Sequence, residues 1–190
     1  MTATATATET RTTSAWNIDP THSLVEFSAK HMMITTVKGR LADVRGTLTI
    51  DEANPDRSVV DVEFDAASID TRVEQRDAHL RSADFLDVEQ YPKVTFRSRR
   101  VSGARAAEGG RFRIVGDLTI RGTTREVTLD ATFEGRGRDP WGGDRVSFSA
   151  DATIDRRDYG LVWNQALEAG GLLVSNDVRI HIEAQAVRAA

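Results

Sequence analysis

The sequence contains no cysteine, so disulfides, zinc–thiolate sites and thiol nucleophiles are excluded. It also lacks an apolar stretch long enough to span a bilayer, which argues against stable membrane insertion. Basic residues are not in excess: 25 Lys and Arg stand against 29 Asp and Glu, for a net charge of −4. Domains that bind phosphate backbones usually gather a basic excess, so nucleic acid is not an expected partner.

The N-terminus lacks both the basic leader and the apolar core of a secretory signal. Its Thr/Ala repeat, MTATATATETRTTSA, is typical of a disordered tail, which we predict for residues 1–14. The expected location is therefore the cytoplasm. The remaining residues, 15–190, have the length of one ordinary domain that can bury a sizeable core.

Apolar and polar residues alternate with period two from Trp16 onward, which predicts half-buried strands. In residues 37–51 the apolar parity switches between Leu41 and Val44, which indicates a β-bulge or bend within one strand. The predicted strands cover residues 22–31, 37–51, 60–66, 94–98, 112–120, 127–133, 146–154 and 178–186.

Short connections rich in turn residues join these segments, so neighbouring strands are expected to be antiparallel. The predicted fold class is all-β: an eight-stranded antiparallel barrel, with a two-sheet sandwich as the alternative. Such a barrel is either filled by side chains or holds one small ligand. Small residues on the predicted inner face favour a ligand cavity, although they would also relieve crowding where a barrel tapers; they are Ala29, Ala66, Ala131, Ala150, Ala152, Ala184, Gly39 and Gly116.

Residues 72–82, between the third and fourth predicted strands, keep helical periodicity. Thr71 and Glu74 have the spacing of a capping box at its start. Asp77 and His79 would lie about 200° apart around the helix, so they cannot share a metal ion or a proton. We therefore predict a plug helix that packs over an open barrel end through Leu80, Phe85 and Leu86.

The sequence carries no H-E-x-x-H, G-x-S-x-G or P-loop motif. We therefore expect no metal, no cofactor and no enzyme activity. His31 lies on the predicted inner face of its strand, either as a hydrogen-bonded core residue or as a polar contact inside a cavity.

Four segments occur in order: WNIDPTHSLVEFSAKH, RDAHLRSADFLDVEQYPKVTF, GDLTIRGTTREVTL and RRDYGLVWN…GGLLVSNDVRIHIE. From about Trp16 to Val187 they resemble the YceI-like, polyisoprenoid-binding family. The resemblance implies a lipocalin-like eight-stranded barrel, often dimeric, with an apolar tunnel for an isoprenoid or similar amphiphile. It implies a tunnel wall formed by Val25, Phe27, Ala29, His31, Phe64, Phe96, Phe148 and Ile180, closed by Leu80 and Phe85. Ala150, which precedes the small residue Ala152, is expected to border the same space.

The connection from Asp155 to Asn176 is long for this chain and contains Tyr159, Trp163 and the pair Gly170-Gly171. It is predicted to be either a lid over the barrel mouth or a packed loop with its own hydrophobic anchors.

The leading hypothesis is a soluble homodimer that sequesters or carries a polyisoprenoid or similar lipid. One alternative is an enzyme that acts on a lipid-like substrate in the same cavity, with His31 or Asp77 as acid or base. The other is a ligand-free interaction module, favoured if side chains fill the barrel. The expected partner is a hydrophobic small molecule, whose identity an apolar tunnel specifies poorly.

Overall fold

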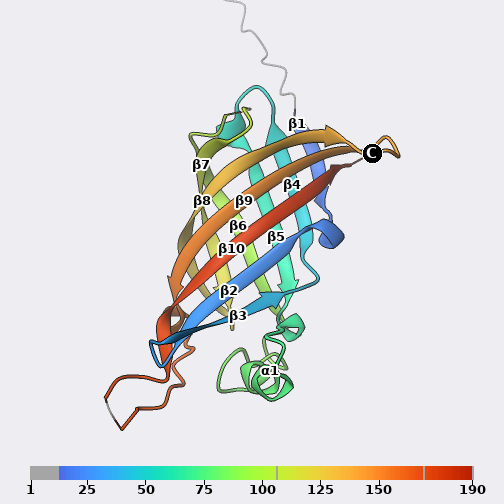
Figure 1. Cartoon of the computed structure of the whole chain (residues 1–190). Helices are drawn as coiled ribbons and strands as arrows, with labels where there is room; N and C mark the ends of the chain where they lie inside the picture. Colours follow the sequence, from blue (N-terminus) through green and yellow to red (C-terminus); the bar gives the residue numbers. More distant parts are fainter. Residues whose placement is uncertain (1–12, 106, 169, 190) are drawn as a thin grey trace, which may run out of the picture.

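The computed structural model describes residues 13–105, 107–168 and 170–189, and within them ten strands, one α-helix and four short 3₁₀ helices (Figure 1). The strands are β1 (Thr13–Ile18), β2 (Leu24–His31), β3 (Thr35–Leu41), β4 (Arg45–Asp51), β5 (Val59–Asp65), β6 (Lys93–Ser102), β7 (Gly110–Ile120), β8 (Thr123–Arg138), β9 (Asp144–Asp155) and β10 (Val174–Arg188). The helices are η1 (Pro20–His22), η2 (Pro55–Arg57), η3 (Ala66–Ser68), α1 (Glu74–Arg81) and η4 (Arg156–Tyr159).

All strand pairs of the sheet are antiparallel. β1 is followed in the sheet by the strands from β4 through β10, and β10 pairs with β1, so these eight strands form a closed ring. The predicted eight-stranded barrel is thus confirmed, and the closed ring excludes the two-sheet sandwich. The β2–β3 hairpin continues the sheet from β10. Residues 186–188 of β10 pair with β1, whereas residues 174–183 pair with β2.

Two predicted boundaries differ from the structure. The single bulged strand predicted over residues 37–51 is two strands, β3 and β4, and Asp43 between them has a φ of 56°. A left-handed residue turns the chain out of the extended path, so the parity switch marks a break rather than a bulge. β1 begins at Thr13, two residues before the predicted domain start. The disordered tail, predicted for residues 1–14, otherwise lies outside the described residues.

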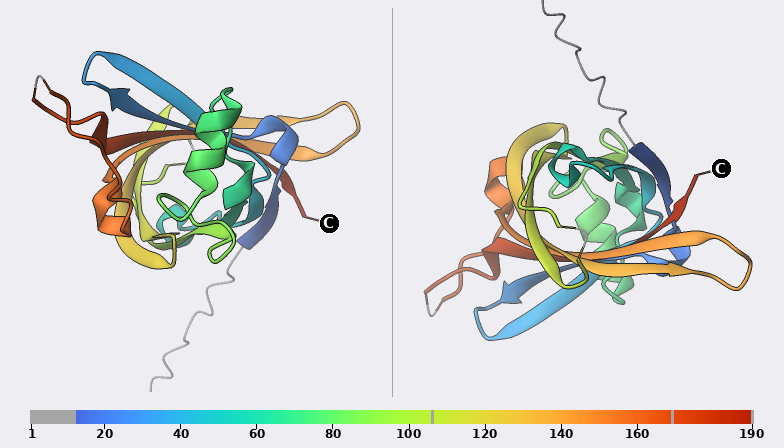
Figure 2. Two further views of the ribbon diagram at one scale, coloured as in Figure 1. Left: turned by 90° about the horizontal axis from the view of Figure 1, so that it is seen from below. Right: turned by 90° about the horizontal axis from the view of Figure 1, so that it is seen from above.

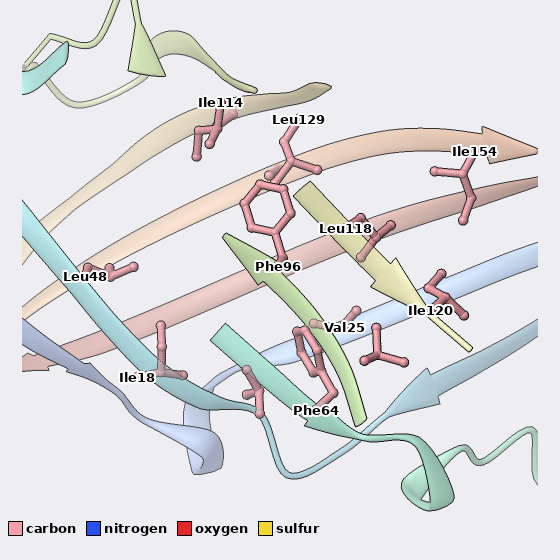
Figure 3. Packing of buried hydrophobic residues seen from close by; sticks show 14 of the residues in the cluster. Ile18, Val25, Leu48, Phe64, Phe96, Ile114, Leu118, Ile120, Leu129 and Ile154 are labelled. Carbon is pink, nitrogen blue, oxygen red and sulfur yellow. The ribbon is translucent and has the colours of Figure 1, made fainter. Parts of the chain in front are cut away.

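The apolar parity of each strand decides which side chains enter the barrel, because successive residues of a strand point to opposite faces. Figure 3 shows apolar side chains from several strands turned toward one another, among them Val25 of β2, Phe64 of β5 and Phe96 of β6. All three are buried. The core of the protein is therefore the inside of the barrel.

The helix α1 lies across one end of the barrel, as the view from below shows (Figure 2). It begins at Glu74 rather than residue 72, and its N-cap is Val73, which makes no side-chain cap. The predicted capping box is wrong, because Thr71 lies two residues before the N-cap and its amide donates to the Asp77 carboxylate rather than to Glu74. Within the described part of the chain, no helix is long and apolar enough to cross a membrane.

Two glycines on the inner face make room for aromatic rings rather than for a cavity. A Cβ at Gly39 would lie 2.3 Å from Cζ of Phe27, its cross-strand neighbour. A Cβ at Gly116 would lie 2.6 Å from Cζ of Phe96 and equally close to the carbonyl oxygen of Arg97. At these positions small residues relieve crowding, because the rings occupy the space that a side chain would need.

The long connection after β9 has a packed first part and an exposed second part, and a lid role for it stays a prediction. Its first part packs against the barrel, where Arg156, Tyr159 and Leu161 are buried. Farther along, Val162 is 68% exposed and Leu172 is 41% exposed. This part projects beyond the lower end of the barrel as a long loop beside the β2–β3 hairpin (Figure 1).

Candidate functional site

The barrel encloses a cavity of about 350 Å³. Side chains from all ten strands, from α1 and from six connections contribute to its wall, and most of them are aliphatic or aromatic. This volume falls in the lower part of the range of roughly 300–1,000 Å³ that is typical of small-molecule sites. The ligand-free hypothesis required a barrel filled by its own side chains. The cavity shows that this barrel is not filled.

Ten of the eleven residues predicted for the ligand site border this cavity. They come from five strands and the α1 region: Val25, Phe27, Ala29, Phe64, Leu80, Phe85, Phe96, Phe148, Ala150 and Ile180. The small residues Ala131, Ala152 and Ala184 also line it, whereas Gly39, Gly116 and Ala66 are outside the described lining. Contact of any of these residues with a ligand stays a prediction.

His31 is the predicted residue that the structure does not place on the cavity wall. It is the last residue of β2, next to the turn into β3, and is partly exposed. The other residues of β2 on this face, Val25, Phe27 and Ala29, do border the cavity. At His31 the β2–β3 hairpin extends beyond the barrel ring, so the inner face of the hairpin no longer borders the cavity.

The cavity is closed at one end by Leu80, Phe85 and Leu86, which belong to α1 and the turn that follows it. Arg121 holds this turn to the β9–β10 connection, because its guanidinium donates to the carbonyl oxygens of Ala83 and Gly160 at 2.8 and 2.9 Å. The predicted plug is therefore fastened to the barrel by hydrogen bonds as well as by apolar packing.

A cluster of rings joins the plug to the same connection. The His79 ring lies edge-on to Phe85 and to Trp163, with centroid distances of 5.1 and 4.7 Å. Trp163 also contacts Phe85 at 5.4 Å. The connection thus braces the closed end of the cavity.

The opposite end of the cavity carries charged residues. Arg136 Nη2 donates to Glu52 Oε2 at 3.0 Å, and Ser14 Oγ donates to Glu52 Oε1 at 3.1 Å. The Arg136 guanidinium also lies 5.9 Å from the centroid of the Phe133 ring. The Arg136 side chain is 42% exposed, so this end is in contact with water.

Arg156 is the residue that sequence reasoning missed. It is 3% exposed and borders the cavity at the end of β9. The signal was present: on β9 the inward series Ala150, Ala152 and Ile154 reaches Arg156 at the next step of two. A prediction that ends the inward series at the last apolar residue omits a cation that continues the pattern.

Asp77 and His79 have separate partners, as the helix geometry predicted. Asp77 Oδ1 accepts from the amide and the hydroxyl of Thr71, whereas His79 Nε2 contacts Asp84 Oδ2 at 2.9 Å. Across the described residues, no group of three or more His, Asp or Glu side chains could hold a metal ion.

A closed barrel of eight antiparallel strands around an apolar cavity defines the class of β-barrel proteins with room for one small ligand. The sequence profile of the YceI-like domain matches residues 16–186. The chain therefore belongs to the YceI-like family.

The chain is 41% identical over 140 residues to Protein YceI of Escherichia coli O157:H7, which covers 74% of this chain and 71% of the relative. The Campylobacter jejuni YCEI protein has a similar structure, with a TM-score of 0.71 and 27% identity over 85% of this chain and 90% of its own. A polyisoprenoid binding domain from Saccharophagus degradans, implicated in plant cell wall breakdown, gives a TM-score of 0.69 at 17% identity. The likeness to the latter covers 93% of this chain and 99% of that domain and shows the fold alone.

Proposed function

We propose that this protein binds one long-chain hydrophobic molecule, a polyisoprenoid or similar amphiphile, inside the barrel and sequesters or carries it. The observation that carries the proposal is the cavity of about 350 Å³ with its almost entirely apolar wall. Polar groups that could hold water are few on this wall, so a hydrocarbon chain is the occupant that it suits best.

Binding would be driven by removal of apolar surface from water, which contributes roughly 25 cal/mol for each Å² buried. Most side chains of the wall are Val, Leu, Ile, Phe and Ala, none of which offers a hydrogen bond. Such a wall favours length and flexibility in the ligand rather than a particular pattern of polar groups.

The comparisons support the same ligand class. The domain from Saccharophagus degradans is described as polyisoprenoid binding, and it shares the barrel fold with this chain. Membership of the YceI-like family, whose profile covers most of the chain, adds to this support.

The proposal is tested by native mass spectrometry of the protein purified from its own host, followed by organic extraction. We expect one lipid molecule per chain, with a mass that corresponds to a long-chain isoprenoid or related amphiphile. In parallel, delipidated protein is titrated with geranylgeraniol, and binding should raise its thermal midpoint. Protein that yields no lipid and shows no shift with geranylgeraniol would contradict the proposal.

The homodimeric state and the cytoplasmic location stay predictions. Light scattering coupled to size-exclusion chromatography checks the first, and subcellular fractionation of the host checks the second. Loss of lipid on dimer dissociation would link the oligomeric state to binding.

A further inference from the structure

The helix-covered end of the cavity contains a buried cation. Arg156 is 3% exposed and borders the cavity. Its Nε donates to the carbonyl oxygen of Ser175 at 2.9 Å, and its Nη1 donates to the carbonyl oxygens of Leu161 and Trp163. These acceptors are neutral, so the guanidinium is anchored in place without being neutralised.

Arg156 forms no ion pair with any carboxylate in the described parts of the chain. The neighbouring carboxylate of Asp155 accepts instead from Nε and Nη2 of Arg157. The Nη2 atom of Arg156 is buried and has no hydrogen-bond partner among the described residues. Burial lowers the pKa of this guanidinium, as expected for a charge that has left water without full compensation.

The opposite end of the cavity differs in this respect. Arg136 is paired with Glu52 at 3.0 Å, and both side chains are partly exposed. A second anion there would compete with the Glu52 carboxylate and with water. At Arg156 an incoming anion would displace no hydrogen-bonded carboxylate, because the guanidinium is buried and its Nη2 has no partner among the described residues.

We propose that Arg156 binds the anionic head of the ligand, a phosphate or a carboxylate, with the apolar chain running from the helix-covered end toward the opposite mouth. This inference rests on the proposed function. A guanidinium presents parallel N–H donors that match the oxygens of phosphate and carboxylate, and such charge-assisted bonds are the strong ones. The unpartnered Nη2 supplies the donors, while Nε and Nη1 keep the group fixed.

The first test uses wild-type protein and three probes: geranylgeranyl monophosphate, geranylgeraniol and inorganic phosphate. The monophosphate should bind about 10- to 100-fold more tightly than the alcohol. The preference should persist in about 1 M NaCl, because a buried pair is screened far less than an exposed one. Inorganic phosphate should give no thermal shift, since it lacks the chain that the cavity buries.

The second test compares Arg156→Met with Arg136→Met, which removes a cation from the opposite end. Arg156→Met should lose the preference for the monophosphate and still bind geranylgeraniol, whereas Arg136→Met should keep the preference. If Arg156→Met does not fold, Arg156→Lys, which keeps the charge without the planar fork, and the wild-type salt series decide the question. With Arg156→Lys the preference should fall at least about threefold.

Four results would overturn the inference. Two concern affinity in the wild-type protein: equal affinity for the monophosphate and the alcohol, or a preference for the monophosphate that high salt abolishes. The others are a preference lost in Arg136→Met but kept in Arg156→Met, and a thermal shift with inorganic phosphate equal to that with the monophosphate. In each case binding of geranylgeraniol would leave the proposed function standing. Failure to bind either lipid would contradict the proposed function itself.

Discussion

Thr71 donates two hydrogen bonds to one oxygen of Asp77: its amide lies 2.8 Å and its hydroxyl 2.5 Å from Oδ1. Both residues are buried. Arg76 completes the arrangement, because its Nε donates to the Thr71 hydroxyl oxygen and its Nη2 to the Thr71 carbonyl oxygen, at 2.7 and 2.9 Å. The aspartate therefore fastens the segment before α1 to the helix.

Asp77→Ala should lower the free energy of unfolding by about 1–3 kcal/mol, because two buried donors lose their acceptor. Glu74→Ala, at an exposed position of the same helix, should change it by no more than about 0.5 kcal/mol. Urea denaturation of both variants measures the difference, and a cycle with Thr71→Val isolates the coupling. Equal losses in Asp77→Ala and Glu74→Ala would show that the bond contributes little.

Ala150→Trp should displace the ligand and leave the fold intact, because Ala150 borders the cavity and the indole can occupy ligand space. The matched control is Ala186→Trp. Ala186 is fully buried on β10 outside the described lining, so an indole there is overpacking that should cost about 1–3 kcal/mol or more. Extractable lipid and the thermal midpoint of delipidated protein are the readouts. Similar midpoints for the two variants would contradict an accessible cavity at Ala150.

Tyr159→Phe should raise stability at neutral pH by about 1 kcal/mol, since the buried Tyr159 hydroxyl has no hydrogen-bond partner among the described residues. Burial raises the pKa of Tyr159 to about 12. Tyr159 therefore ionises in the unfolded state at a lower pH than in the folded state. As the pH rises from about 10 toward 12, this ionisation stabilises the unfolded state and lowers the free energy of unfolding of the wild-type protein. The advantage of the Phe variant should grow over that interval by up to about 1.4 kcal/mol per pH unit.

Urea denaturation of both proteins at pH values between about 8 and 11 checks this prediction. A Phe variant that is less stable than wild type at neutral pH would indicate that the hydroxyl is satisfied in solution, for example by an ordered water molecule.

The β2–β3 turn should accept a better turn sequence. Met32 and Met33 have φ values of 52° and 59°, and the amide of Ile34 donates to the carbonyl oxygen of His31 at 3.0 Å. Positive φ at both central positions is the requirement of a type I′ turn, which favours Asn-Gly. The double substitution Met32→Asn, Met33→Gly should raise the free energy of unfolding by about 1 kcal/mol.

Ile34→Thr is the control for this turn, because Ile34 is 76% exposed and outside the left-handed region. Its effect should stay within about 0.5 kcal/mol. A loss of stability in the Asn-Gly variant would mean that the methionine side chains contribute contacts that outweigh the backbone strain.

Strand parity predicted most of the cavity wall, because the alternation of side chains in a strand is a direct consequence of backbone geometry. Phe64, Phe96 and Phe148 border the cavity for this reason. His31 shows the limit of the rule: it shares the inward face, but the hairpin that carries it leaves the barrel ring. Parity gives the face of a strand and not the position of the strand in the barrel.

Competition between local partners explains the error at the start of the helix. Thr71 and Glu74 have capping-box spacing, yet the Thr71 amide donates to the Asp77 carboxylate instead of to Glu74. The same helix brings the side chain of Asp77 close to Thr71. Which of the two carboxylates, Glu74 or Asp77, accepts from Thr71 therefore depends on three-dimensional geometry. The break at Asp43 was equally open in the sequence, since aspartate is one of the few non-glycine residues that enter the left-handed region without being confined to it.

The pairing of β10 with strands from the beginning of the chain affects how the protein is made. Ser23 Oγ donates to the carbonyl oxygen of Gln185 across 162 residues of sequence, and β1, β2 and β9 all pair with β10. During synthesis β1 and β2 must therefore leave the ribosome long before their partner exists. Until then the growing sheet exposes open edges and an apolar inner face, which is the state in which nascent chains recruit chaperones. Closure by residues of such large separation makes folding slow, and the cavity can be enclosed only after β10 has left the ribosome.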